Sequence, residues 1–70
     1  MPLFAAPIGT ELKIVKVSAD GETKRHLENL WILPGAMITV LKSEGGNVIV
    51  RVKDGRIALT KALALQILVG

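Results

Sequence analysis

The chain has 70 residues, half of them hydrophobic, and nine basic against six acidic residues give it a formal net charge of +3. A core of this size is already marginal and cannot be divided, so we expect a single domain spanning residues 1–70. The absence of cysteine excludes a disulfide framework and a thiolate metal site, and it is compatible with a reducing cytosol.

Neither the hydropathy nor the charge pattern of the chain indicates a membrane protein or a domain that binds duplex DNA. Residues 1–9 lack a basic n-region and carry Pro2 and Pro7, which argues against a secretory signal. No apolar run approaches the roughly 20 residues that a membrane-spanning helix needs. A duplex-binding domain usually has a denser basic stripe than this chain, in which acidic residues are scattered among the lysines. We therefore expect a soluble, cytoplasmic protein.

The first predicted elements are a strand and a short helix. Residues 10–17 alternate apolar and polar side chains, with Leu12 and Ile14 on one face, which is typical of a half-buried strand. A polar turn cluster follows and leads into a helix, for which Thr23 is a plausible N-cap and Asp20 a competing one. A helix of about two turns is not stable alone and must dock on the rest of the chain.

The end of this helix carries a narrow apolar stripe and then a turn. Leu27, Leu30 and Trp31 fall at positions i, i+3 and i+4. Pro34 and Gly35 predict a type II turn, because proline fixes φ at the first central position and glycine supplies a positive φ at the second.

The second half of the chain predicts four further strands. Alternation around Ile38 and Val40 gives the first, and Gly45-Gly46 permits a tight reversal into the second, whose valines share one face. Asp54-Gly55 predicts a type I′ hairpin turn, since both central residues of that turn need a positive φ. Residues 56–59 then return as a strand, residues 60–64 form one helical turn, and residues 65–69 close the chain as a strand.

Five short strands, with one short α-helix between the first and the second, suit a mainly β fold, a small closed barrel. Closure removes the exposed edges that a β-rich chain must otherwise protect. The periodicity of each element predicts the residues of the shared core: Leu27, Leu30, Ile38, Val40, Val50, Val52 and Ile67.

The sequence offers little catalytic chemistry. It has no paired-carboxylate motif, no glycine-rich phosphate cradle, and no serine or cysteine nucleophile with a plausible base, so we do not expect an enzyme. Glu22 and His26 lie at i and i+4, where two ligands could share a helix face. A closed zinc site needs about four ligands and an open one about three, so we favour a solvated face and expect no metal site and no cofactor.

Basic residues lie opposite the valines of the predicted hairpin. Arg51, Lys53 and Arg56 could contact an anionic partner, either nucleic acid or an acidic protein surface, or could form an ordinary solvated sheet face, which we favour. Sequence-tolerant binding of single strands needs aromatic stacking platforms. Only Phe4 and Trp31 are present, and they are far apart in the sequence.

Three segments together resemble one known family. The first is an apolar residue and a glycine, Ile8-Gly9, before the strand "LKIVKV". The second is a helix-turn signature, basic-basic-Leu-x-x-Leu-Gly-Ile-x-Pro-Gly, matched at Arg25, His26, Leu27, Leu30, Ile32, Pro34 and Gly35. The third is a closing pattern matched at Leu59, Ala64, Ile67 and Val69. With these segments the chain resembles the FeoA family, from about Leu3 to Val69.

The resemblance implies an SH3-like barrel and a function. Members of the family are small cytosolic accessory proteins of ferrous iron uptake, which act through protein–protein contact with the large membrane permease FeoB, whose cytosolic part carries a GTP-binding domain. The resemblance implies no small-molecule substrate and only an indirect association with the membrane. Two alternatives stay open: a small basic barrel that binds nucleic acid, and a regulatory module like the one at the C-terminus of some metal-dependent repressors.

The sequence departs from the family pattern at His26, often an arginine, and at Trp31, usually a glycine. A glycine after a helix commonly adopts the left-handed conformation, in which another residue loses on the order of 1–2 kcal/mol. Trp31 could continue the apolar stripe into the core, but we predict that it is exposed beside Lys24 or Glu28. This surface would serve a partner or a weakly bound second copy of the chain, and its candidate contact residues are Lys24, Arg25, Glu28, Trp31, Pro34 and Gly35.

Overall fold

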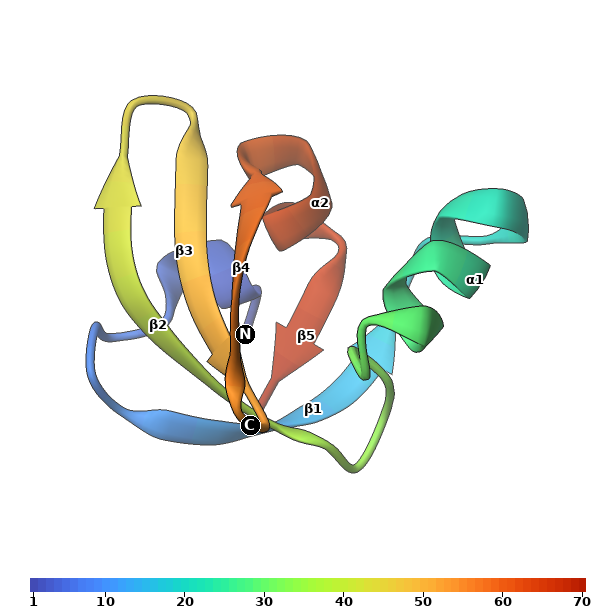
Figure 1. Ribbon diagram of the computed structural model, residues 1–70, viewed down its shortest axis with the longest axis horizontal. Coiled ribbons are helices and arrows are strands. Elements are labelled where there is room, and N and C mark those ends of the chain that lie inside the picture. The colour runs from blue at the N-terminus through green and yellow to red at the C-terminus, as the bar shows by residue number, and fades with distance from the viewer.

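The computed structural model describes all residues, 1–70. Five antiparallel strands form one curled sheet in the order β4-β3-β2-β1-β5 (Figure 1), which confirms the expected mainly β fold. The strands are β1 (Glu11–Val17), β2 (Met37–Glu44), β3 (Asn47–Val52), β4 (Gly55–Thr60) and β5 (Ile67–Val69). The helical elements are the 3-10 turn η1 (Leu3–Ala5), α1 (Gly21–Asn29) and α2 (Lys61–Leu65).

Two bulges give the sheet its curl. In β1 the register shifts between Ile14 and Lys16, which leaves Val15 as an extra, exposed residue. The residues before the bulge pair with β2, whereas those from Ile14 onward pair with β5. A second shift in β2 falls between Val40 and Lys42. A bulge bends its strand and increases the local twist, so β1 and β2 can wrap around a single core.

The sheet does not close through hydrogen bonds, and the expectation of a fully closed barrel is wrong in this respect. β4 and β5 end the strand order and are not paired with each other. Helix α2 lies between them (Figure 1), and the Thr60 hydroxyl caps it by accepting a hydrogen bond from the Leu63 N–H at 3.3 Å. A short helix therefore spans the gap that a closed barrel would fill with strand pairing.

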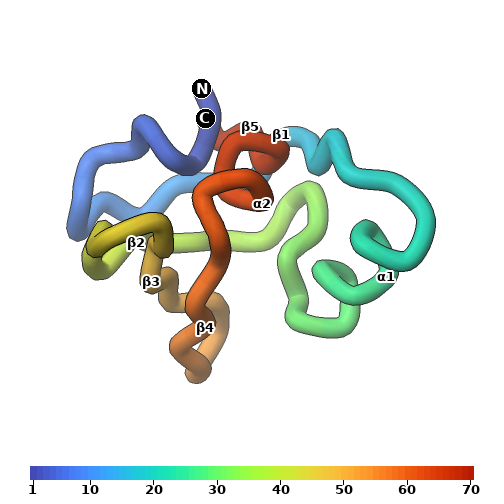
Figure 2. The backbone as a smooth tube through the Cα atoms, turned by 90° about the horizontal axis from the view of Figure 1, so that it is seen from above, coloured from blue at the N-terminus to red at the C-terminus, as the bar shows by residue number.

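The N-terminal segment covers the outer edge of β5. The Met1 amino group donates to the Val69 carbonyl at 2.9 Å, and the Val69 N–H donates to the Met1 carbonyl at 2.7 Å. Pro2 forms an isolated bridge with Leu68. The two chain ends consequently lie side by side (Figure 2), and β5 is shielded from edge-to-edge pairing.

The buried core contains six of the seven predicted residues. Leu30 is the exception, since it is only partly buried and packs at the margin of the core. It follows the last residue of α1 as the C-cap, so the helical stripe ends before it. Fully buried residues outside the prediction include Leu3, Ile32 and Ala64, and the complete core is Leu3, Ala6, Ile14, Ala19, Leu27, Ile32, Ile38, Val40, Val48, Val50, Val52, Leu59, Ala64, Ile67 and Val69.

Two local predictions need correction. Asp20, the competing N-cap candidate, occupies the N-cap position of α1 without a capping hydrogen bond from its side chain, whereas Thr23 lies inside the helix. The β3–β4 turn places its positive φ of 55° on Lys53, and Val52 pairs with Gly55. Asp54 and Gly55 therefore do not form a type I′ turn. The two central residues of the turn are Lys53 and Asp54, one position earlier than the predicted Asp54-Gly55 pair.

Neither α1 nor α2 has the length and the continuous apolar character that a bilayer-crossing helix requires.

The core assignment predicts unequal effects of two neighbouring leucines. We expect Leu27→Ala to lower the free energy of unfolding by about 2–5 kcal/mol, because it leaves a cavity at a fully buried position. Leu30→Ala should lower it by clearly less, since that side chain is partly solvated in the folded protein. Denaturation in urea, with linear extrapolation to water, measures both values. Equal losses for the two variants would contradict this assignment.

Candidate functional site

The candidate site begins at the C-terminus of α1, where the backbone forms a Schellman motif. The Trp31 N–H donates to the Glu28 carbonyl at 2.9 Å, and the Ile32 N–H donates to the Leu27 carbonyl at 2.9 Å. These bonds satisfy carbonyls that the helix end would otherwise leave unpaired, and the motif requires a left-handed residue between them. Trp31 supplies that residue, with a φ of 67°.

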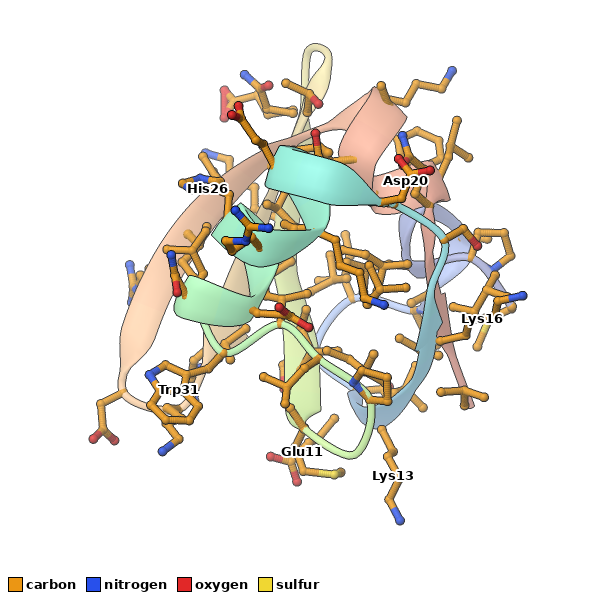
Figure 3. The ribbon with its side chains drawn as sticks, turned by 90° about the vertical axis from the view of Figure 1, so that its right-hand side faces the viewer. Glu11, Lys13, Lys16, Asp20, His26 and Trp31 are labelled. Carbon is orange, nitrogen blue, oxygen red and sulfur yellow. The ribbon has the colours of Figure 1, made fainter.

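This motif decides which side chains face the core. Leu27 and Ile32, which the second of these hydrogen bonds joins, are both fully buried in the core cluster. A hydrophobic contact between these two positions commonly accompanies a Schellman motif. Trp31 lies between them in the chain and is directed outward (Figure 3), with 55% of its surface exposed. The prediction that Trp31 is exposed is confirmed.

The indole has a neighbour that the sequence did not predict. Lys53 from the β3–β4 turn places its Nζ 4.0 Å from the centroid of the Trp31 ring. A lysine ammonium over an indole face at this distance makes a cation–π interaction, worth about 0.5–1 kcal/mol at an exposed site. The contact links two segments that lie 22 positions apart in the sequence.

Trp31 and Lys53 are also the two residues other than glycine that have a positive φ in this chain. Each pays a steric penalty, since the left-handed conformation brings Cβ close to the backbone of an L-residue. The cation–π contact offsets only part of that penalty. Such strained positions persist when the surrounding structure determines them, and they concentrate at functional sites.

The turn after Trp31 is fixed to the sheet. The Ala36 N–H donates to the Leu33 carbonyl at 3.1 Å, and Gly35 has a φ of 94°, as a type II turn requires at that position. The Ile14 N–H donates to the Ala36 carbonyl and the Gly35 N–H donates to the Ile14 carbonyl, both at 2.8 Å. The predicted Pro34-Gly35 turn is thus confirmed, and two hydrogen bonds to β1 hold it in place.

A groove of about 520 Å³ lies between this turn, the Trp31–Lys53 pair and the outer face of the sheet. Its floor and walls come from the turn, from the start of β1 and β2, and from the end of β3. Trp31 and Glu11, which both line it, lie below α1 in Figure 3. The lining residues are Glu11, Trp31, Leu33, Pro34, Gly35, Ala36, Met37, Thr39, Arg51, Val52 and Lys53.

The groove contains half of the predicted contact residues. Trp31, Pro34 and Gly35 line it, whereas the exposed side chains of α1, Lys24, Arg25 and Glu28, do not. These three form a separate, solvated face of the helix.

The predicted contact set omitted the residues that β1, β2 and β3 contribute. Arg51 and Lys53 had a signal in the sequence, since the predicted alternation placed both opposite the valines, although β3 ends at Val52 and Lys53 lies in the turn that follows. Glu11 and Met37 carried no comparable signal, because only the pairing of β1 with β2 brings them to the same place as the turn.

The side chains of the groove do not form a recognisable catalytic or metal site. Glu11 is its one acidic residue, and its one hydroxyl, on Thr39, has no histidine or second carboxylate within the groove. No three histidine, cysteine, aspartate or glutamate side chains gather anywhere in the structure. His26 lies along α1, apart from Trp31 and Glu11 (Figure 3).

The Schellman geometry predicts opposite effects of two substitutions at Trp31. In Trp31→Gly the left-handed strain disappears together with the cation–π contact, so the free energy of unfolding should stay the same or rise by up to about 1 kcal/mol. In Trp31→Ala the strain remains while the contact is lost, so the free energy of unfolding should fall by about 0.5–1 kcal/mol. Chemical denaturation compares the three proteins, and a glycine variant less stable than the alanine variant would contradict the assignment.

We predict that the isolated chain has no stoichiometric metal site, because it contains one histidine and no cysteine. Equilibrium dialysis against ferrous iron, under anaerobic conditions, and against zinc should retain less than one tightly bound ion per chain. One retained ion per chain that is lost in His26→Ala, but kept in the matched surface variant Glu44→Ala, would overturn this prediction.

Comparison with known proteins gives consistent relatives. The FeoA domain family matches residues 1–70. A protein of Methanocaldococcus jannaschii, named as a candidate Fe(2+) transport protein A, is 31% identical over 68 residues, which cover 97% of this chain and 83% of that protein.

Two solved structures have the same fold. The crystal structure of an iron uptake regulatory protein, FeoA, superposes with a TM-score of 0.89 at 28% identity, covering 99% of this chain and 93% of the other. FeoA of Stenotrophomonas maltophilia, a prokaryotic SH3-domain protein solved in complex with zinc, superposes with a TM-score of 0.87 at 24% identity, covering 100% and 89%. The fold is accordingly SH3-like, and a family match over the whole chain, with a relative above 30% identity, establishes that this protein belongs to the FeoA family.

Proposed function

We propose that this protein is a non-catalytic, cytoplasmic accessory protein of ferrous iron uptake, and that it acts by docking on the cytosolic part of a FeoB-type permease. Membership of the FeoA family supports the link to ferrous iron. Two relatives, named as an Fe(2+) transport protein A and an iron uptake regulatory protein, agree with it. Contact with the membrane would then be indirect, through the permease.

The observation that carries the docking mechanism is the outward-facing Trp31 at the rim of the groove. Tryptophan is enriched among the interface residues that contribute most to binding, particularly where it can be desolvated between two proteins. The ring is 55% exposed in the isolated chain, and exposed Met37 lies in the same groove. A large apolar surface is therefore available without any rearrangement of the core.

The groove is also preorganised. The Schellman motif sets the direction of Trp31, and the two hydrogen bonds of Ile14 hold the Leu33–Ala36 turn. A rigid surface loses little conformational entropy when a partner binds, so more of the contact energy contributes to affinity. Docking, and not catalysis, is the use that this arrangement supports best.

Charge in the groove disfavours nucleic acid as the main partner. Glu11 lines the groove opposite Arg51, and Asp54 follows Lys53 in the neighbouring turn. Both carboxylates would repel a phosphate backbone, whose binding depends on the release of counterions by unopposed cations.

Calorimetric titration of the intact protein with the cytosolic part of the cognate permease tests the proposal. We expect saturable binding, and we expect Trp31→Ala to weaken it by roughly 10-fold or more, as for a residue of central importance in an interface. Leu65→Ala is the matched control, since Leu65 is also an exposed apolar side chain but lies on α2, outside the groove. No saturable binding at high micromolar concentration, or equal effects of the two substitutions, would count decisively against docking through this groove.

A further inference from the structure

The two long walls of the groove carry opposite charges. Strand pairing aligns Glu11 of β1 with Thr39 of β2, and Thr39 with Arg51 of β3, so these three residues form a row across the outer face of the sheet. Arg51 and Lys53 make the β3 side of the groove cationic, while Glu11 makes the β1 side acidic. Between these walls, the turn and the start of β2 contribute the apolar side chains of the groove.

The cationic wall is reinforced on its outer side. Arg56 of β4 pairs directly with Arg51 of β3, and both side chains are exposed. Like charges directly opposite each other on one sheet face are destabilising. Arg56 is not itself a lining residue of the groove, so this pairing extends the positive charge of the β3 side beyond the groove and onto β4.

No carboxylate of the chain neutralises this pair. The single ion pair in the structure joins Lys42 and Glu44, with 2.9 Å between Nζ and a carboxylate oxygen, at the far end of β2. Asp54 is close in the sequence to Lys53 and Arg56 but lies within ion-pair distance of neither. Both arginines thus keep their planar sets of donors available, and a carboxylate can accept two hydrogen bonds from each such set.

From this placement we infer that the groove binds an extended protein segment that has an aspartate or glutamate next to a large apolar residue. The acidic side chain pairs with Arg51 inside the groove and with Arg56 next to it on β4, and the apolar side chain packs against Trp31 and Met37. This rests on the proposed function only in taking the groove as the docking surface, and it adds the chemical class of the segment that docks.

The opposite walls select against other anions. A polyphosphate would place further negative charge beside Glu11, on the opposite side of the groove from Arg51. A protein segment can instead present one carboxylate to the arginines and a neutral or basic group to Glu11. Electrostatic complementarity of this kind determines specificity and orientation more than affinity.

Selection from an unbiased library of short random peptides, displayed against the immobilised intact protein, tests this inference without the permease. We expect the recovered peptides to share an acidic residue adjacent to leucine, isoleucine or phenylalanine. A synthetic peptide with a recovered sequence should, when it binds, change the fluorescence of Trp31, the one tryptophan in the chain. The double variant Arg51→Gln with Arg56→Gln should bind it roughly 10-fold or more weakly, and Arg51→Lys should retain part of the affinity.

Lys42→Gln provides the matched control, because it also removes one exposed cation of the sheet but lies outside the groove. Its affinity for the peptide should equal that of the unmodified chain. Recovery of neutral or basic peptides, recovery of none, or unchanged binding by the double glutamine variant would overturn the inference. Tighter binding of oligodeoxythymidine than of the peptide would also overturn it and would assign the arginines to nucleic acid.

The two proposals fail in different ways. If the permease binds the double glutamine variant as well as it binds the unmodified chain, the inference fails while the proposed function holds. If acidic peptides bind through the arginines but the permease does not bind at all, the proposed function fails while the inference holds for a different protein partner.

Discussion

The hydrogen bond from the Ile32 N–H to the Leu27 carbonyl is the constraint on which the rest of the site depends. It ends α1 and directs the two side chains at its ends into the core, where both are fully buried. Trp31, the left-handed residue immediately before Ile32, carries its side chain away from that core. Trp31 therefore faces solvent as a direct consequence of the way in which the helix is anchored.

The contact between Trp31 and Lys53 joins two backbone segments that each carry left-handed strain. Glycine at either position would remove the strain there, yet it would also remove one partner of the contact and one side chain that lines the groove. Local strain retained at the expense of stability is characteristic of binding surfaces, where a fixed side-chain direction matters more than the backbone energy. The strain at Trp31 is consistent with a docking role and is not required by the fold.

Sequence patterns predicted the parts of this structure that depend on local chemistry. Alternation located the valines of β3, and Pro34-Gly35 located a turn that the φ of Gly35 confirms. The patterns failed where tertiary pairing decides the outcome. β4 and β5 are not paired, because helix α2 lies between them. Glu11 and Met37 line the groove because of the register between β1 and β2. No local sequence pattern encodes either outcome.

The side chain at position 31 changes the surface of the groove but not the fold. The Schellman motif needs only a residue that accepts a positive φ at position 31. The contacts with the core come from Leu27 and Ile32, so the side chain at position 31 can vary without a change of architecture. A glycine there would leave the groove with its cationic β3 wall but without the indole. In the docking that we propose, the Arg51–Arg56 pair supplies an electrostatic contact and the Trp31 ring an apolar one. A partner that used both would have to present an acidic and an apolar group at a fixed separation, which is a stronger requirement than either contact makes alone.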